Sequence, residues 1–166
     1  EVQKGFHLLA EILGRTPDCF AAPAWRITPE ALHALELFPF QYESNCRGHS
    51  LFRPVIEGRL FRHVQAPTTL STYDELIGLN CTEETYNDYL LHMIRPDQLN
   101  VLTIHAEAEG IGCLALFQDF LDKAKKQNIA LKPLGEILSE AKTIEASGLV
   151  QGTVDGRDGW LSCQED

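Results

Sequence analysis

Short apolar runs alternate along this chain with stretches of helical spacing, and this alternation is the feature that most limits its fold. Apolar runs typical of strands occupy 19–22 and 101–104, and further strands are expected near 40–43 and at 129–134. Helical stretches separate these runs. Strands and helices that alternate at this spacing are typical of βαβ units with a parallel sheet, so the sequence predicts an α/β fold.

The helices have clear start and stop signals. Residues 2–13 carry apolar side chains at helical spacing and stop at Gly14, and threonines that precede acidic residues begin three later helices. The pattern predicts helices at 2–13, over about ten residues after Thr28, briefly after Thr72, from Thr82 to the residues before Pro96, near 114–127 and at 134–146. The segment 48–69 lacks clear periodicity, and the glycine-rich tail predicts a hairpin or an extended closing strand.

The number of strand–helix units is too small for a closed barrel. We count about four units, whereas a complete (β/α) barrel needs on the order of 250 residues. An open half-barrel would expose unpaired strand edges and apolar helix faces. The first residues are already helical and the single methionine is Met93. We therefore expect a missing amino-terminal part of the barrel, or a partner that replaces it.

Charge and composition exclude several classes of protein. The net charge is −10, which argues against nucleic acid as a partner because phosphate binding needs clustered Lys and Arg. There is no run of 18 apolar residues, and the first residues lack the pattern of a signal peptide. The five cysteines are widely spaced with no CxxC pair, which favours reduced thiols over a zinc knuckle.

The stretch VLTIHAEAEG ends a predicted strand at His105 and continues with Glu107 and Glu109. In parallel α/β folds the carboxyl ends of the strands form the crevice that binds ligands, so His105 is a candidate for chemistry. A neighbouring carboxylate from Glu43, Glu107 or Glu109 would stabilise the imidazolium and keep its proton available. The alternative is a half-exposed histidine that satisfies a local hydrogen bond.

Other predicted strand ends also carry polar side chains. Strand ends converge on one mouth of such a fold, so residues far apart in the sequence are expected to meet there. The residues expected at this mouth are Trp25, Arg26, Tyr42, Glu43, Ser44, Asn45 and His105. A thiol dyad of Cys46 or Cys113 with His105 is an open alternative that nothing specific supports.

The segment from Arg47 to His63 reverses the acidic balance of the chain. It holds four arginines against one glutamate, interleaved with apolar residues: Arg47, Arg53, Arg59 and Arg62 against Glu57. Such a loop is able to bind an anionic group on an apolar molecule, because guanidinium groups pair well with phosphate. The alternative is a solvated loop whose arginines pair with surface carboxylates.

Six stretches, in their order and spacing, carry a family resemblance. FAAPAWR, YESNCRG, FRPV, TIHAEAEG, KPLGEILSE and GRDGWL together resemble the carboxyl-terminal part of the polysaccharide deacetylase (NodB-homology) family. The resemblance covers residues 1–166. Within the family it is to the deformylases that act on undecaprenyl-phosphate-linked 4-deoxy-4-formamido-L-arabinose during lipid A modification.

The resemblance implies a fold and an enzyme class. It implies the carboxyl-terminal portion of a distorted (β/α) barrel, so that 1–166 would be a partial catalytic domain whose amino-terminal metal-binding part is absent. The family reaction is the metal-assisted hydrolysis of an amide. A divalent metal (Zn, Mn or Co) held by one aspartate and two histidines is therefore expected, although no metal ligand is assignable to this chain.

The resemblance also implies roles for particular residues. The TIH stretch matches the last family motif, so His105 would be the general acid. Residues expected to bind substrate are Trp25, Arg26, Tyr42, Glu43, Ser44, Asn45, Arg47, Arg53 and Glu107. Ala21 stands where the wider family has an arginine, for which Arg26 is the candidate replacement, and either Glu43 or Asn45 stands in the place of the aspartate that tunes the histidine.

The implied partner is a polyprenyl-phosphate-linked amino sugar. Contact with the inner membrane would then be peripheral, on the cytoplasmic side, through the lipid carrier. We expect the isolated chain to be inactive as a hydrolase because it lacks the metal motifs. The alternative is an inactive fragment or a binding module for a phosphorylated polyprenyl sugar.

Overall fold

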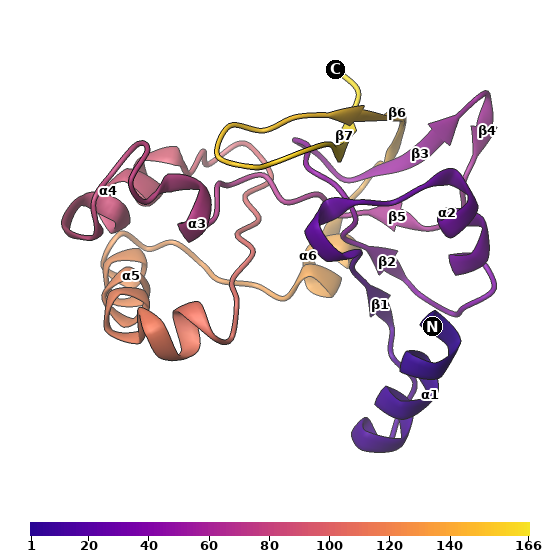
Figure 1. Ribbon diagram of the computed structural model, residues 1–166, viewed down its shortest axis with the longest axis horizontal. Coiled ribbons are helices and arrows are strands. Elements are labelled where there is room, and N and C mark those ends of the chain that lie inside the picture. Colours follow the sequence, from indigo (N-terminus) through magenta and orange to yellow (C-terminus); the bar gives the residue numbers. More distant parts are fainter.

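The computed structural model describes residues 1–166 as a sheet-bearing part joined to a helical lobe. Figure 1 shows the strands and α2 on one side, α3, α4 and α5 in a lobe on the other, and α1 projecting beyond β1. The helices are α1 (Val2–Leu13), α2 (Pro29–Leu35), α3 (Tyr73–Leu76), α4 (Glu83–Met93), α5 (Leu114–Lys126) and α6 (Leu134–Glu140), with a 3-10 turn η1 (Pro23–Trp25) and a π-helix η2 (Ala108–Gly112).

The sheet is mixed rather than purely parallel. Its strands are β1 (Cys19–Phe20), β2 (Tyr42–Glu43), β3 (Phe52–Ile56), β4 (Arg59–Leu60), β5 (Val64–Gln65), β6 (Glu145–Gly152) and β7 (Leu161–Gln164). They follow the order β1-β2-β5-β3-β6-β7, with β4 paired to β3. β1, β2 and β5 are parallel and so are β3 and β6, whereas β5 and β3, β3 and β4, and β6 and β7 are antiparallel. The α/β class is as predicted, but a closed barrel is not formed by these strands.

The capping signals located the helices well. The Thr28 side chain accepts a hydrogen bond from the Ala31 amide at the start of α2, and Thr72 and Thr82 begin α3 and α4 with capping boxes. Gly14 ends α1 in the left-handed conformation, at φ 65°. These positions were predictable because helix ends are set by local hydrogen bonds.

The segment 48–69, expected to be irregular, contains three strands. Glu57 and Gly58 both have positive φ, 50° and 78°, and form a two-residue turn that pairs β3 with β4. Such primed turns match the twist of a hairpin. Pro54 and Gly58 therefore do not break the sheet, because one lies within a strand and the other makes the turn.

Two predicted strands are absent. In the run 101–104 only Val101 is paired, where its carbonyl accepts from the Thr69 and Leu70 amides, and Ile104 is 47% exposed. The segment 129–133 also has no strand partner. Both segments line one largely apolar cavity of about 1080 Å³. A strand forms only where a neighbouring strand pairs with its backbone, and neither segment has such a neighbour.

The carboxyl-terminal segment differs from its prediction in one respect. The expected helix 134–146 ends at Glu140, and β6 starts at Glu145. The expected hairpin of the tail is confirmed by the antiparallel pairing of β6 with β7. β6 also extends the sheet by pairing with β3, and this long-range contact has no local signal in the sequence.

The apolar core has two separate clusters. One joins α3, α4 and α5 and consists of Leu70, Leu76, Tyr86, Leu90, Leu91, Phe120 and Ala124. The other lies between α2 and the sheet and consists of Ala22, Ile27, Leu32, Leu35, Phe40 and Phe61. No helix in the structure has both the length and the apolarity needed to cross a lipid bilayer. All five cysteines have free thiols.

Replacing Gly58 by Ala should lower the free energy of unfolding by about 1–2 kcal/mol, because a Cβ disfavours the left-handed backbone that the β3–β4 turn requires. Urea unfolding followed by circular dichroism measures the change. Gly5→Ala is the matched control: the added Cβ meets open space in α1, so helix propensity should raise stability by up to about 1 kcal/mol. Equal effects of both substitutions would contradict the assigned turn.

Candidate active site

Trp25 lies at the centre of a cluster of polar and charged side chains. It is 6% exposed, and both Trp25 and Ala24 have left-handed backbones, with φ 52° and 54°. Its indole Nε1 donates to Thr68 Oγ1 at 3.0 Å. Two consecutive non-glycine residues at positive φ cost energy, and such strain persists only where the surroundings fix it.

Two guanidinium groups lie over the Trp25 ring. The Cζ atoms of Arg47 and Arg157 are 5.1 Å and 4.5 Å from the ring centroid. Both are within the range of attraction between a cation and an aromatic face. The ring is therefore a wall that orients two cations from distant parts of the chain.

Glu75 binds both of these arginines. Arg47 Nη1 donates to both carboxylate oxygens at 2.8 and 2.9 Å, and Arg157 Nε donates to Oε1 at 2.6 Å. Arg47 also donates to the carbonyls of Thr68 and Leu70. Burial by itself raises the pKa of Glu75, but the hydrogen bonds from Arg47 and Arg157 outweigh it and hold the pKa below its ordinary value. Glu75 is thus a buried carboxylate kept ionised by two cations.

The hairpin between β6 and β7 is held against the Trp25 turn by Arg26. Its Nε donates to the Trp160 carbonyl at 2.9 Å, and its Nη2 to the Asp158 carbonyl at 2.7 Å. A Cβ at Gly159 would lie 2.9 Å from Arg26 Nη2, so only glycine allows this approach. The GRDGWL stretch therefore places Arg157 against Glu75, and its backbone carbonyls accept hydrogen bonds from Arg26.

A second polar cluster is buried around Glu43. Its Oε1 is 2.7 Å from His63 Nδ1, and its Oε2 accepts from Asn45 Nδ2 at 2.6 Å and from Gln65 Nε2 at 2.9 Å. Asn45 Oδ1 accepts the Ala22 amide at 2.8 Å, three residues before Trp25. Glu43 is 1% exposed and Asn45 is fully buried. Glu43 and Asn45 thus hold the strand that leads into the Trp25 turn.

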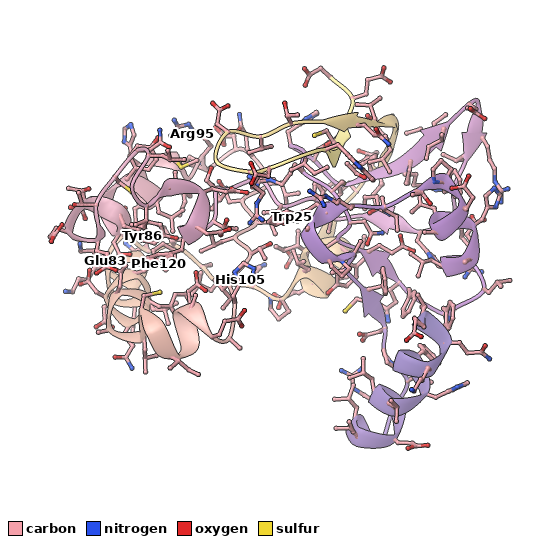
Figure 2. The ribbon with its side chains drawn as sticks, viewed as in Figure 1. Trp25, Glu83, Tyr86, Arg95, His105 and Phe120 are labelled. Atoms are coloured by element: carbon pink, nitrogen blue, oxygen red, sulfur yellow. The ribbon has the colours of Figure 1, made fainter.

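His105 is half-buried and connected to the Trp25 cluster through threonines. Thr68 Oγ1, which accepts from Trp25, lies 2.7 Å from Thr103 Oγ1, two residues before His105. The His105 amide donates to Glu109 Oε2 at 2.7 Å. Figure 2 shows His105 between the lobe that carries Tyr86 and Phe120 and the turn that carries Trp25.

The remaining predicted residues lie outside these hydrogen-bond networks. Burial and a hydrogen bond with Cys19 raise the pKa of Tyr42 to about 12. Ser44 is half-buried and its amide donates to the Phe20 carbonyl, while Glu107 is exposed and follows His105. Arg53 lies in β3, and its buried Nε has no hydrogen-bond partner. The structure therefore brings together Trp25 with Arg47, and separately Glu43 with Asn45.

Comparison with known proteins shows which proteins the chain resembles. No family model matches the chain. A protein of Shewanella sediminis is 41% identical over 166 residues, which is 99% of this chain and 53% of that protein; it carries the name "Probable 4-deoxy-4-formamido-L-arabinose-phosphoundecaprenol deformylase ArnD". A protein of Wigglesworthia glossinidia brevipalpis with the same name is 35% identical over 99% of this chain and 58% of that protein. This chain is homologous to the ArnD proteins. The resemblance inferred from the sequence is confirmed.

The alignment covers nearly all of this chain but only part of each relative. The chain is covered almost completely, yet it spans little more than half the length of these ArnD relatives. The resemblance to the deacetylase family implies a divalent metal held by an aspartate and two histidines. No group of three or more His, Cys, Asp or Glu side chains in the structure is close enough to hold a metal ion. The residues present in this ArnD-related chain do not fit such a centre.

Sequence reasoning missed several members of the two clusters. Glu75, Arg157, Thr68 and His63 make the central hydrogen bonds but were not singled out. Two of these residues have a local signal in the sequence. Glu75 ends a T-x-x-E capping pattern, and Arg157 lies between two glycines. Thr68 and His63 had no such local signal.

Replacing Glu75 by Gln should lower the free energy of unfolding by about 3–5 kcal/mol at pH 7, because the buried Arg47 and the half-buried Arg157 lose their counter-charge. Denaturant unfolding measures this loss. The pKa of Glu75 is lowered by folding, so its stabilisation is present above the ordinary pKa of about 4.3 and is lost as the pH falls below that value. Glu75→Gln should therefore also show a weaker loss of stability in acid than the unsubstituted chain.

Glu36→Gln is the matched control for this prediction. Glu36 binds Arg59 at 2.7 Å, but the two side chains are 20% and 48% exposed. An exposed ion pair contributes roughly 0–1 kcal/mol. A loss at Glu36 as large as that at Glu75 would show that the buried cluster has no special role.

Proposed function

We propose that this chain is the carboxyl-terminal part of a NodB-type amide hydrolase that removes the formyl group from undecaprenyl-phosphate-linked 4-deoxy-4-formamido-L-arabinose in lipid A modification. The observation that carries the proposal is the homology to ArnD proteins over 99% of the chain, which includes His105 in the TIHAEAEG stretch. The strands seen here would then belong to a distorted (β/α) barrel completed by residues outside this chain.

His105 is proposed as the general acid. When the amide carbon–nitrogen bond breaks, the sugar amine leaves readily only if its nitrogen is protonated. A positioned histidine that donates this proton contributes about 10²–10⁴-fold to the rate. The hydrogen bonds of Glu109 with the His105 amide and carbonyl, together with the threonine link to Trp25, support this assignment, because they fix the peptide groups on both sides of the histidine.

The substrate-binding set is proposed to act in two ways. Trp25, Glu43, Asn45 and Arg47 are buried and hydrogen-bonded, so they would shape the wall of the site rather than contact substrate with free donors. A larger part of the contact with substrate is assigned to the more accessible members of the set, which are Arg26, Tyr42, Ser44, Arg53 and Glu107.

Arg53 is the arginine proposed to bind the carrier phosphate. Arg47 is engaged by Glu75, Arg59 by Glu36, and Arg62 by the Phe38 carbonyl. The half-buried Arg53 side chain makes no hydrogen bond and its Nε is buried, so the ends of its guanidinium retain the donors for an anion. The other arginines of this segment behave as structural ion pairs and hydrogen-bond donors.

The family metal would have to be held by residues outside this chain, because the chain offers no fitting ligand group. When bound, such a metal supplies polarisation of the carbonyl and activation of water. Contact with the inner membrane is proposed to be peripheral, on the cytoplasmic side and through the lipid carrier. The isolated chain is proposed to be inactive.

A binding module is the second candidate function. It is favoured by one observation, the lack of a metal-ligand group among the side chains of this chain. Such a module would bind the phosphorylated polyprenyl sugar without hydrolysing it.

Formate release from the formamido-arabinose lipid in detergent micelles, with added zinc, manganese or cobalt, separates the two candidates. The protein as its gene encodes it should release formate, and the 166-residue chain alone should not. Tight binding of the lipid by both forms without formate release would favour the binding module. Turnover by the 166-residue chain alone would contradict its proposed inactivity.

His105→Ala in the protein as its gene encodes it should lower kcat for formate release by about 10²–10⁴-fold, because the leaving amine loses its proton donor. Steady-state assays across pH measure the effect. His92→Ala is the control: this histidine is exposed in the last turn of α4 and should leave kcat unchanged. An unchanged rate in His105→Ala would remove the assigned role.

A further inference from the structure

Glu109 makes two reciprocal hydrogen bonds with His105. Its Oε2 accepts the His105 amide at 2.7 Å, and its own amide donates to the His105 carbonyl at 3.0 Å. The two bonds close a ring between residues four apart, in the manner of a capping box. Glu109 thereby fixes the peptide groups on both sides of the His105 Cα.

The position of Glu109 is costly for a carboxylate. The residue is 4% exposed, and its Oε1 is buried with no hydrogen-bond partner. It borders a small cavity of about 10 Å³ whose other walls include Tyr86, Leu102 and Phe117. A buried carboxylate with an unsatisfied oxygen disfavours folding, whereas an apolar side chain there would not. Stability alone therefore does not account for a glutamate at this position.

Glu109 affects the pKa of two neighbouring groups, Tyr86 and Cys113. Burial raises the pKa of Tyr86, and the carboxylate of Glu109 raises it further. The same two causes, in the same order, raise the pKa of the Cys113 thiol. Glu109 thus lies among groups that stay neutral, without a cation to balance it.

The backbone after His105 is also unusual. Ala108–Gly112 form a π-helix, in which the Gly112 and Cys113 amides donate to the Glu107 and Ala108 carbonyls. Short π-helical turns are uncommon and occur frequently at functional sites. This turn brings the Glu109 side chain inward while Glu107, two residues earlier, stays exposed.

We propose that Glu109 is the positioning residue of His105, an inference that rests on the proposed general-acid role of that histidine. Thr103 is fixed by its hydrogen bond to Thr68, and Glu109 fixes His105 itself. With the backbone held at both points, the Cα–Cβ bond from which the imidazole extends has a set direction. The carboxylate acts through hydrogen-bond geometry, so a neutral acceptor of the same shape should serve in its place.

The kinetic test compares Glu109→Leu, Glu109→Gln and the exposed control Glu11→Leu, in the protein as its gene encodes it. Glu109→Leu should lower kcat at least tenfold with little change in KM, because a displaced catalytic group costs up to about 10²-fold. Glu109→Gln keeps an acceptor oxygen and should retain most of kcat, and Glu11→Leu, in α1 and outside the proposed site, should not change it. Wild-type kcat in Glu109→Leu would overturn the proposal.

Two further variants test whether Glu109 acts through His105. Adding Glu109→Leu to His105→Ala should cause no further loss of kcat, because the positioned group is already gone. A further loss would overturn the proposal. The thermal midpoint of Glu109→Leu should be no lower than that of the unsubstituted protein, since an unsatisfied buried carboxylate has been removed. A large drop in this midpoint, together with loss of activity in Glu109→Gln, would assign a purely structural role and overturn the proposal.

Nuclear magnetic resonance of protein labelled at histidine gives a readout that does not need turnover. The His105 amide should exchange faster with solvent, and its ring resonances should shift, in Glu109→Leu but not in Glu11→Leu. Unchanged His105 ring resonances in Glu109→Leu would overturn the positioning role. Absence of formate release by the unsubstituted protein would instead contradict the proposed function, while the ring resonances still decide whether Glu109 positions His105.

Discussion

The carboxylate of Glu75 is the charge on which the arrangement of the site depends. It binds Arg47 after β2 and Arg157 from the terminal hairpin, and both guanidinium groups lie over Trp25. Three parts of the chain more than twenty residues apart are thereby joined at one point. A buried carboxylate with two cations is stable only as a complete set, because removal of one member leaves a charge without compensation. The strained turn at Trp25 is kept in place by this set.

From this cluster a short chain of hydrogen bonds leads to the proposed general acid. Trp25 donates to Thr68, Thr68 shares a hydrogen bond with Thr103, and Glu109 holds the His105 amide. Hydrogen bonds in a buried network support one another because the local dielectric is low. The site therefore consists of a rigid cationic wall and a histidine tethered beside it. The proposal that this histidine acts as a general acid rests on the homology to ArnD proteins.

The accuracy of the sequence predictions followed the range of the interactions that decide each element. The starts of α2, α3 and α4 were predictable, because Thr28, Thr72 and Thr82 act on amides two or three residues away. The β3–β5 region was expected to be irregular because Pro54, Gly58 and Pro67 interrupt its pattern, yet β3 also pairs with β6, and β5 with β2, which lie elsewhere in the chain. The run 101–104 was expected to be a strand from its apolar composition, but a strand also needs a partner. The candidate site was predictable to the level of segments, since Trp25, Arg26 and Arg47 were identified while Glu75 and Arg157 were not.

The sequence by itself determined the α/β class, the starts of the helices and the resemblance to the ArnD proteins, because capping residues, helical periodicity and ordered motifs are local properties. Only the tertiary structure decided which charges are neutralised. In the folded chain Arg47 pairs with Glu75, and Glu43 is buried against His63. Glu109, rather than Glu107, accepts the hydrogen bond from the His105 amide. The physical reason is that the energy of a charge depends on its burial and on partners distant in the sequence, and neither is encoded in local spacing.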